Sequence, residues 1–415
     1  MPDGTTPVTN IMVDGKNIAA IGDVPDTFRP GKVIDGKNHL AVSGFVNAHT
    51  HTSMTLLRSY ADDMALMDWL NDMVWPAEAK MNSDDIYWGA MLAMVEMVRS
   101  GTTTFADMYG PYMDRVAEAA MDAGIRGVLS RGIIGVAPDG DKKLQENVEL
   151  YKDFHGSADG RITVMFGPHA PYTCPPEFLQ KVAKTAQSMG AGIHIHMHET
   201  KTEVEDSLKQ YGKRPFAWVA ETGLFDGGFT LAAHCVHLDD NDIAIMKKYK
   251  ISAAHNPGSN MKLASGVSPV PRLLSEGIVT ALGTDGASSN NNLDMLEEVN
   301  LASMLHKVNE YDPLAVPAFE ALKMGTEYGA KAVGIEKLGR LEAGCKADIT
   351  LWNMNSPAWF PRNNPVSLLV YAANSSSVDT VICDGNVIME NNELRTLDEE
   401  RICYEAQRCA DRLTK

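Results

Sequence analysis

The chain has 415 residues, of which 44% are hydrophobic and 22% charged, and its formal net charge is -17 at pH 7. These proportions are those of an ordinary globular protein and exclude extensive disorder, while the negative charge disfavours nucleic acids and anionic membranes as partners. The start MPDGTTPVTN has neither a basic nor an apolar segment, and no stretch approaches 18 consecutive apolar residues, so we expect a cytoplasmic protein without membrane spans.

The two ends of the chain are predicted to consist of short antiparallel strands. Residues 9–40 and 340–395 contain alternating apolar and polar positions interrupted by DG and NN turns, a pattern typical of β-hairpins. We expect both chain ends together to form one small β-sandwich domain, which comprises residues 1–41 and 337–415.

Two histidines stand directly after the apolar run LAVSGFV, in the stretch GFVNAHTHTSM. In an extended strand His49 and His51 point to the same face, with Cα atoms roughly 6.5 Å apart, so their nitrogens can converge on one ion. The alternative is that one histidine caps the strand and the other is solvated. Because the six scattered cysteines include no CxxC pair, a metal here would use nitrogen and oxygen ligands.

From about residue 84 onward, amphipathic helical patterns alternate with short apolar runs. DDIYWGAMLAMVEMVRSG precedes TTTFADM, for example, and PEFLQKVAKTAQSMG precedes AGIHIHMH. Such repeated pairs indicate a mostly parallel sheet built from βαβ units. With LAVSGFVNAH and ITVMFGPHA added, they supply about eight strands over roughly 290 residues, and we predict a (β/α)8 TIM barrel for residues 42–336.

Nearly every predicted barrel strand finishes in a group that can bind a metal or move a proton. A barrel of this kind carries its chemistry at the C-terminal ends of its strands. A single histidine there is more often a packed core residue than a ligand, but so many at one rim indicate a site. In chain order these residues are His49, His51, Asp107, Arg131, His169, His194, His196, His198, Glu199, His234, His237, His255 and Asp285.

Neutral imidazoles with one carboxylate are the ligand set of catalytic zinc. His49, His51, one histidine of HIHMH and Asp285 would supply this set. Strand periodicity places the first histidine of HIHMH one layer deeper, which leaves His196 and His198 as alternatives. Asp285 could instead be the N-cap of a following helix.

The sequence resembles the amidohydrolase superfamily through GFVNAHTHTSMTLLRSYADDMALMDWL, GPHAPYTC, IHMHET, AAHCVHL, AHNPGSNMKLASG and LGTDGASSNNNLDM. More narrowly, it resembles the 5-methylthioadenosine/S-adenosylhomocysteine deaminase branch, which has chlorohydrolase-like and cytosine-deaminase-like relatives. The resemblance covers nearly the whole chain, including GCKADITLW and DGNVI near the C-terminus.

This resemblance implies the metal ligands and the number of metal ions. The HxxE motif of the family matches HMHE and makes His196 the ligand, beside His49, His51 and Asp285, and Glu199 the catalytic carboxylate. The fourth strand ends in MFGPHAPY and lacks the lysine that bridges two metals in some relatives. One divalent ion is implied, with zinc as the first choice and iron or manganese as alternatives.

The resemblance also implies a mechanism. A zinc-bound water has a pKa near 7, so hydroxide is available at neutral pH. Asp285 would accept its proton, Glu199 would protonate a ring nitrogen beside the attacked carbon, and His234 would polarise the nucleophile or stabilise charge. Without the resemblance, Glu199 could be only a first-turn helix carboxylate.

Three further residues match positions that contact the nucleoside in the family. Glu78 lies 29 residues after the first metal histidine, at the offset of a glutamate that binds ribose hydroxyls, and Arg131 and His169 match other substrate contacts. Glu78 could instead be a solvated helix carboxylate, and Arg131 a structural ion-pair member. Where relatives often carry another arginine, Lys142 and Lys143 stand here, and a lysine lacks the bidentate fork for a carboxylate.

The sequence therefore predicts a zinc aminohydrolase that converts 5-methylthioadenosine, S-adenosylhomocysteine or adenosine to the inosine-type product and ammonia. The alternative within the superfamily is a hydrolase of another N-heterocycle, similar to triazine chlorohydrolases or to guanine or cytosine deaminases. A non-enzymatic relative kept as a structural subunit is a third reading, which the complete ligand set disfavours. We expect a small-molecule nucleoside as the partner, and a homo-oligomer.

Overall fold

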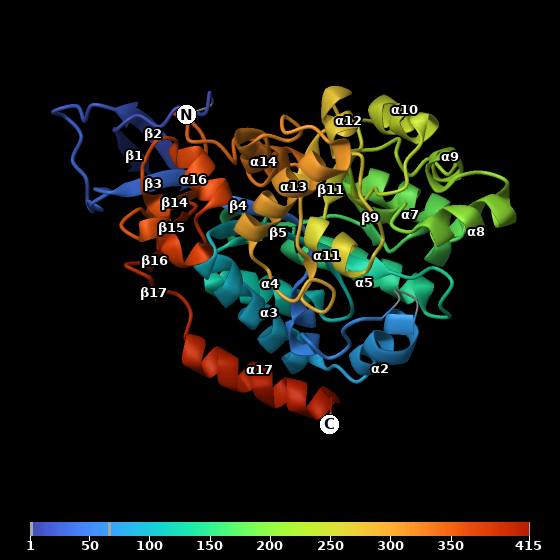
Figure 1. The fold of residues 1–415 in the computed structure, drawn as a ribbon. Coiled ribbons are helices and arrows are strands. Elements are labelled where there is room, and N and C mark those ends of the chain that lie inside the picture. The colour runs from blue at the N-terminus through green and yellow to red at the C-terminus, as the bar shows by residue number, and fades with distance from the viewer. Residues whose placement is uncertain (1–2, 65–67, 415) are drawn as a thin grey trace.

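The computed structural model describes residues 3–64 and 68–414. At its centre, parallel strands form a closed ring (Figure 1). The pairing of β13 with β4 closes the ring on one side, and a parallel bridge between Phe166 and Ile193 joins β7 and β9 on the other. In ring order the strands are β4 (Phe45–His51), β5 (Thr102–Tyr109), β6 (Arg126–Ile133), β7 (Ile162–Val164) with β8 (Gly167–Pro168), β9 (Ile193–Met197), β10 (Thr230–His234), β11 (Ser252–His255) and β12 (Thr280–Leu282) with β13 (Asp285–Gly286).

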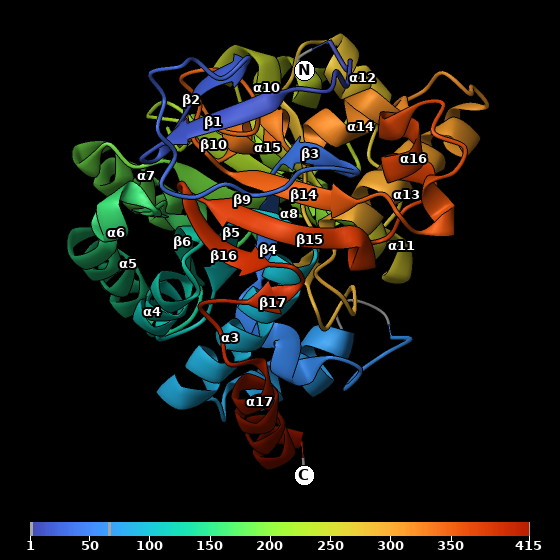
Figure 2. The ribbon, with the colours of Figure 1, turned by 90° about the vertical axis from the view of Figure 1, so that its left-hand side faces the viewer.

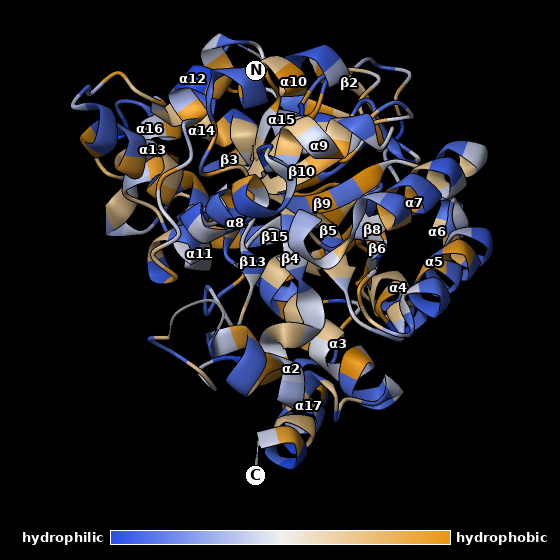
Figure 3. Cartoon of the chain, turned by 90° about the vertical axis from the view of Figure 1, so that its right-hand side faces the viewer, coloured by the Kyte–Doolittle hydropathy of each residue, from blue (hydrophilic) through white to orange (hydrophobic). Residues whose placement is uncertain are grey.

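Helices cover the outside of this ring, and the predicted (β/α)8 barrel is confirmed. Figure 3 shows hydrophobic colours on central strands such as β9 and hydrophilic colours along the outer helices α7 and α8. The barrel helices are α2 (Trp75–Glu78), α3 (Ser83–Arg99), α4 (Met113–Ala123), α5 (Gly140–Phe154), α6 (Ser157–Gly160), α7 (Pro176–Met189), α8 (Lys201–Tyr211), α9 (Pro215–Glu221), α10 (Asp240–Tyr249), α11 (Pro257–Lys262), α12 (Val270–Ser275), α13 (Met295–Glu310), α14 (Ala318–Met324) and α15 (Glu327–Ala332). Shorter turns are η1 (Thr52–Leu57), the π-helical η2 (Trp69–Val74) and η3 (Pro171–Thr173).

Local sequence explains where these helices begin and end. Asn82 caps α3 by accepting hydrogen bonds from the main-chain N–H groups of Asp84 and Asp85, while the Asp85 carboxylate accepts from Asn82 N. Helix α7 begins with Pro176 in its first turn and ends at Gly190, whose φ of +66° places it in the left-handed region.

Both chain ends form one β domain, as predicted (Figure 2). Its antiparallel sheet has the order β17-β16-β15-β14-β3, and the hairpin β1-β2 lies against it. Ile18, Ala347, Ile349 and Ile382 pack between them. The strands are β1 (Asn10–Asp14), β2 (Asn17–Gly22), β3 (His39–Ser43), β14 (Ile349–Asn353), β15 (Val378–Cys383), β16 (Asn386–Glu390) and β17 (Glu393–Leu394); between β14 and β15 lie η4 (Pro357–Trp359), α16 (Pro365–Tyr371) and η5 (Ser375–Ser377). The exact domain boundaries stay a prediction.

The apolar run LAVSGFV enters two sheets, not one strand as predicted. Strand β3 ends at Ser43 in the β domain, and β4 begins at Phe45 in the barrel. Gly44 between them packs so closely against Thr103 that an added Cβ would lie 2.2 Å from the Thr103 Oγ1 atom. The chain therefore changes sheet at a residue where no side chain fits.

The C-terminal helix α17 (Glu399–Thr414) was not predicted. It packs against α3 on the barrel and contacts α2 (Figure 3). Its buried residues Ile402, Ala406, Cys409 and Leu413 recur every three or four positions and form one apolar face. Helix α17 thus follows the β domain in sequence but packs on the barrel.

Within residues 3–64 and 68–414, no helix is both long and apolar enough to cross a membrane. The six cysteines are free, and Cys403 on α17 is exposed while the other five are buried.

Candidate metal centre and active site

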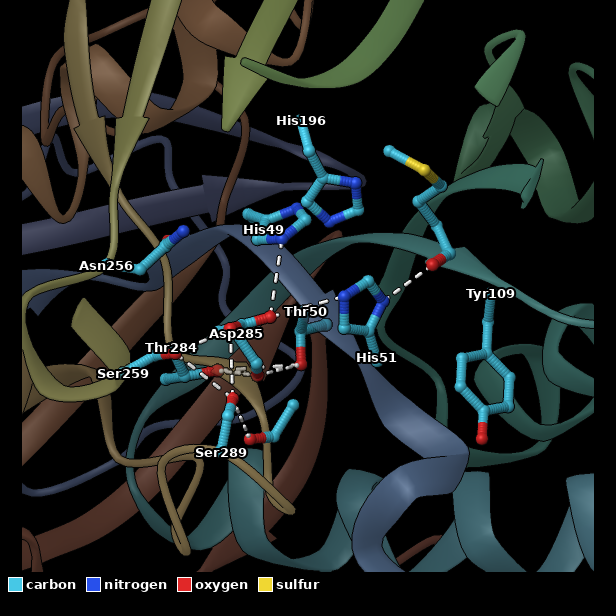
Figure 4. Close-up of polar contacts among 12 residues, drawn as sticks. His49, Thr50, His51, Tyr109, His196, Asn256, Ser259, Thr284, Asp285 and Ser289 are labelled. Atoms are coloured by element: carbon cyan, nitrogen blue, oxygen red, sulfur yellow. Dashed lines mark hydrogen bonds and ion pairs between the residues drawn. The ribbon is translucent and has the colours of Figure 1, made fainter. Parts of the chain in front are cut away.

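Side chains from four strand ends converge at the C-terminal rim of the barrel, and Figure 4 shows those of His49, His51, His196 and Asp285. Strand β4 supplies His49 and His51, β9 supplies His196, β10 supplies His234 and β13 supplies Asp285. One possible ligand atom each from His49, His196 and His234 lies within 4.8 Å of the others, and the same holds for His49, His51 and Asp285. Both groups share His49, so all five residues belong to one cluster.

Asp285 faces the cluster because of its backbone conformation. Its φ of +60° is left-handed, and its Oδ1 lies 3.4 and 3.2 Å from the Nε2 atoms of the two β4 histidines. Ser259 Oγ (2.6 Å) and Ser289 Oγ (2.9 Å) donate to its Oδ2. Burial alone would raise the pKa of Asp285, but the two β4 histidines beside its carboxylate hold it well below its usual value. The helix-cap alternative does not apply, since Asp294 is the N-cap of α13.

The outer nitrogen of each clustered ring on β4 and β9 makes a hydrogen bond away from the cluster, and His51 and His196 donate in theirs because the partner is a carbonyl oxygen. These bonds run from His49 Nδ1 to His194 Nε2 (2.8 Å), from His51 Nδ1 to Met108 O (2.6 Å) and from His196 Nδ1 to His169 O (2.7 Å). The Nε2 lone pairs are therefore free to face an ion, and His49 Nε2 is buried with no hydrogen-bond partner in the described chain. Burial lowers the pKa of His49 to about 3 and that of His196 well below the usual value, so these two imidazoles are neutral. Burial alone would also lower the pKa of His51, but Asp285 beside it raises that pKa to about 9. This donor set fits a divalent ion such as zinc.

The alternative between His196 and His198 is decided by one turn. His198 has a φ of +55°, so its ring points away from the cluster and stacks on Phe216. Its Nδ1 donates to His237 O (3.0 Å), and its Nε2 accepts from Phe216 N (3.2 Å). Both ring nitrogens of His198 are thus used by the protein, and only His196 is in the cluster.

A cavity of about 120 Å³ opens onto the cluster. Its wall combines apolar and aromatic side chains with carboxylates, imidazoles and one guanidinium group. Its lining comprises His51, Met54, Trp69, Leu70, Trp75, Glu78, Met108, Tyr109, Gly110, Arg131, Gly132, Ile134, His169, Tyr172, His196, Glu199, His234, Leu263 and Asp285.

Glu78 and Arg131 both line this cavity, as expected for substrate contacts. Tyr109 OH donates to Glu78 Oε1 (2.8 Å), and burial raises the pKa of Glu78. Arg131 also makes structural contacts, since its Nε donates to Glu146 Oε2 (2.7 Å) and its Nη1 to Gly132 O (2.7 Å). Glu78 is therefore not a solvated helix carboxylate, and Arg131 is both an ion-pair member and part of the wall.

Glu199 and His234 face each other across the cavity. Glu199 Oε2 lies 3.8 Å from His234 Nε2, and burial raises the pKa of Glu199. His234 has a φ of +72°, and its Nδ1 donates to Asn260 Oδ1 (2.9 Å). The outer side of this ring is therefore fixed, and its Nε2 points into the cavity.

His169 lines the cavity as predicted, and burial lowers its pKa to about 4. Lys142 and Lys143 on α5 form ion pairs with neighbouring carboxylates. Lys142 Nζ lies 3.7 Å from Glu146 Oε1, and Lys143 pairs with Asp139. Neither lysine is among the residues that line the cavity.

Sequence reasoning missed the residues that support the predicted ones. Tyr109 stands two residues after the strand-end Asp107 of TTTFADM, and an aromatic residue at that rim position was the available signal. Trp69 and Trp75 stand between the β4 histidines and Glu78 in the chain and form the apolar wall. Ser259 and Ser289 lie in the motifs AHNPGSN and TDGASSN, but a serine in a loop gives no sign of which carboxylate it holds.

Comparisons with known proteins agree with this geometry. The model of the amidohydrolase family matches residues 40–388. A 5-methylthioadenosine/S-adenosylhomocysteine deaminase of Pelotomaculum thermopropionicum is 52% identical over 99% of this chain and 95% of its own length. A protein of the same name from Syntrophomonas wolfei is 52% identical over 92% of this chain and 88% of its own length.

Solved structures share the fold over nearly the whole chain. An adenosine deaminase from Xanthomonas campestris with bound zinc has a TM-score of 0.93 and 33% identity, and covers 98% of this chain and 93% of its own. Atrazine chlorohydrolase from Arthrobacter aurescens, complexed with zinc and atraton, has a TM-score of 0.89 and 25% identity, with coverage of 97% and 95%.

Proposed function

The chain belongs to the amidohydrolase family, and from this premise we propose that it deaminates 5-methylthioadenosine and S-adenosylhomocysteine, with adenosine as a further candidate substrate. The reaction replaces the 6-amino group by oxygen and releases ammonia. The observation that carries the proposal is the 52% identity, over nearly both full lengths, to relatives that bear this name. A cytoplasmic location and a homo-oligomer stay predictions.

The proposed ligands of one divalent ion, zinc by preference, are His49, His51, His196 and Asp285. The zinc-containing neighbour and the convergent nitrogen and oxygen donors support this assignment, although the same donors suit iron or manganese. When bound, such an ion acts as a Lewis acid and makes water available as a nucleophile at neutral pH.

Three residues move or hold protons in the proposed mechanism. Asp285 accepts the proton of the attacking water through Oδ1, while the two serine hydroxyls hold its Oδ2. Glu199 can carry a proton because burial raises its pKa, and it delivers that proton to the ring nitrogen beside the attacked carbon. His234, 3.8 Å from Glu199, stabilises the charge that develops between them.

The proposed substrate class rests on Glu78 and on the apolar part of the cavity wall. Glu78 is oriented by the hydroxyl of Tyr109, and a carboxylate held in this way suits the two hydroxyls of a ribose. The apolar wall of Trp69, Leu70 and Leu263 suits a thioether substituent. A triazine has no vicinal diol, so Glu78 favours a nucleoside over the triazine alternative suggested by the chlorohydrolase neighbour.

The direct test is ammonia release from 5-methylthioadenosine, S-adenosylhomocysteine, adenosine, guanine, cytosine and a chlorotriazine. We expect turnover of the adenosine-type compounds and none above background for the free bases and the triazine. Preferential turnover of guanine, cytosine or the triazine would contradict the proposed substrate class.

A second prediction concerns recognition of the sugar. If Glu78 accepts hydrogen bonds from both ribose hydroxyls, Glu78→Ala should lose transition-state binding of about 1.5 to 3 kcal/mol for each charge-assisted bond. The measurement is the ratio of kcat/KM for a ribose substrate to that for its 2′,3′-dideoxy analogue, which should be large in the unmodified enzyme and close to one in the variant.

The matched control is Asp72→Ala, since Asp72 is an exposed carboxylate on the neighbouring η2 segment. It should leave the ratio unchanged. An equal ratio in the unmodified enzyme and in Glu78→Ala would remove Glu78 from sugar recognition.

A further inference from the structure

Within residues 3–64 and 68–414, the carboxylate of Glu199 makes no hydrogen bond of its own. Its ion-pair contact there is with His234 Nε2 at 3.8 Å, which is too long for a hydrogen bond. The place of this carboxylate in the cavity must therefore be set by the main chain of residues 198 and 199.

That main chain is held by a second glutamate, Glu203. Its Oε1 accepts from His198 N (2.9 Å) and its Oε2 accepts from Glu199 N (2.8 Å). Both oxygens of one carboxylate thus bind two successive main-chain N–H groups. Glu203 is 7% exposed, so water does not readily replace these two bonds.

The two N–H groups converge on Glu203 because His198 is in the left-handed region, with a φ of +55°. A non-glycine residue in this conformation is strained and persists only where its surroundings hold it. Without Glu203 the buried N–H groups of residues 198 and 199 would also lose their acceptors, which destabilises the turn further. The turn would then relax toward another conformation.

Glu203 is itself fixed by the start of α8. Thr200 is the N-cap of this helix, and its Oγ1 accepts from Glu203 N (3.1 Å). The sequence TKTE has the form of a capping box, in which the glutamate would bind the N–H of the threonine. Here the side chain reaches further back, to the two residues before the cap.

We propose that Glu203 is a positioning residue for the reaction: by binding the N–H groups of residues 198 and 199, it fixes the turn that aims Glu199 into the cavity. This inference rests on the proposed function, in which Glu199 transfers a proton. Because a misplacement of about 1 Å can cost about 10²-fold in rate, a relaxed turn should impair catalysis while the metal ligands keep their places.

The test is a double-mutant cycle with Glu203→Gln and Glu199→Gln. Glutamine has the size of glutamate but turns one acceptor into an NH₂ group that faces a main-chain N–H. We expect Glu203→Gln to lower kcat by about 10-fold or more with little change in KM, and to leave one metal per chain. In the Glu199→Gln background the same change should cost less than about 2-fold, because the proton carrier is already absent.

The control is Glu205→Gln, an exposed glutamate on the same helix that pairs with Lys201. It should leave kcat unchanged in both backgrounds. A Glu203→Gln effect of equal size in both backgrounds, loss of metal from Glu203→Gln, or an unchanged kcat would overturn the inference. If Glu203→Gln fails to fold, Glu203→Asp, which keeps the charge but is shorter, replaces it in the cycle.

Hydrogen exchange gives a readout that does not depend on the substrate. The amides of residues 198 and 199 should be protected in the unmodified enzyme and in Glu205→Gln, and should lose protection in Glu203→Gln. Unchanged protection would overturn the inference even if turnover fell. An unmodified enzyme that releases no ammonia from any adenosine-type compound would instead count against the proposed function.

Discussion

At the scale of single residues, the site is organised by atoms that face away from the cavity. His49 Nδ1 is hydrogen-bonded to His194 Nε2 (2.8 Å), so a second imidazole takes the place that a carboxylate or carbonyl commonly has behind a metal-binding histidine. Burial lowers the pKa of His194 well below its usual value, which keeps this ring neutral. Because His194 carries no charge, it orients His49 without adding negative charge to the centre.

The assignment of metal ligands can be tested at this scale. We expect His196→Ala to lose the metal, because it removes one of the converging nitrogens. His198→Ala should retain one metal per chain, since His198 points to Phe216 and His237, although it should lower stability by leaving Phe216 N without an acceptor. Elemental analysis of folded protein decides the matter: metal loss only in the His198 variant, or two metals per chain in the unmodified enzyme, would contradict the proposed centre.

At the scale of elements, the strand ends could be predicted and the turns after them could not. Period-two hydrophobicity and polar rim residues indicated β4, β9 and the position of Asp285, and with them most of the ionisable residues that line the cavity. The left-handed conformations of His198, His234 and Asp285 decide which way each chain leaves its strand, and none of them is a glycine. His234 and Asp285 are held by residues about 26 positions away, and the turn at His198 by a side-chain contact of Glu203 that a helical pattern does not reveal.

The same limit applies to the change of sheet at Gly44 and to α17. An apolar run shows that a strand is buried, but not that two sheets share it. The apolar positions of α17 do follow a helical pattern, but this pattern lies after residues 340–395, the segment for which the sequence predicted strands. Its partner α3 lies about 300 residues earlier in the chain, so packing between the two could not be read from local sequence.

A prediction follows for this helix. Ile402 is 2% exposed, so Ile402→Ala should lower the free energy of unfolding by about 2 to 5 kcal/mol, the usual cost of such a cavity. Cys403→Ala, at the exposed neighbouring position, should change it by less than about 0.5 kcal/mol. Urea unfolding of the metal-loaded enzyme measures both. Equal small effects would show that α17 is not part of the cooperative unit.

At the scale of the whole molecule, a buried ionic cluster joins the barrel to the β domain. Arg126, the first residue of β6, donates from Nε and Nη2 to Asp348 (3.0 and 2.8 Å) and from Nη2 to Asp384 (2.6 Å). All three side chains are at most 1% exposed. Lys16 of the β domain, 3.3 Å from Asp384, completes the cluster. One arginine thus neutralises carboxylates from two segments that follow the barrel in sequence.

Removal of Arg126 should therefore destabilise the molecule strongly and make its stability depend differently on pH. Arg126→Met keeps the volume but leaves two buried carboxylates with Lys16 as the nearest cation, and breaking a buried pair in this way costs about 3 to 5 kcal/mol at pH 7. The exposed pair of Lys209 and Asp206 provides the control, since Lys209→Met should change stability by less than about 1 kcal/mol.

The sign of the pH effect follows from Asp384. Burial alone would raise the pKa of Asp384, but the hydrogen bond from Arg126 holds that pKa below its ordinary value of 3.8. In the unmodified enzyme the ionised Asp384 therefore stabilises the fold above pH 3.8. This contribution to stability is lost as the pH falls through the lowered pKa. In Arg126→Met burial dominates and the folded state binds the proton more tightly than the unfolded state, so this group destabilises the fold as pH rises from about 4 to 7. The stability difference between the two proteins should therefore shrink from pH 7 to pH 5, as measured by urea unfolding at both values with metal present. A difference that stays constant or grows on acidification would show that Arg126 does not act by neutralising these carboxylates.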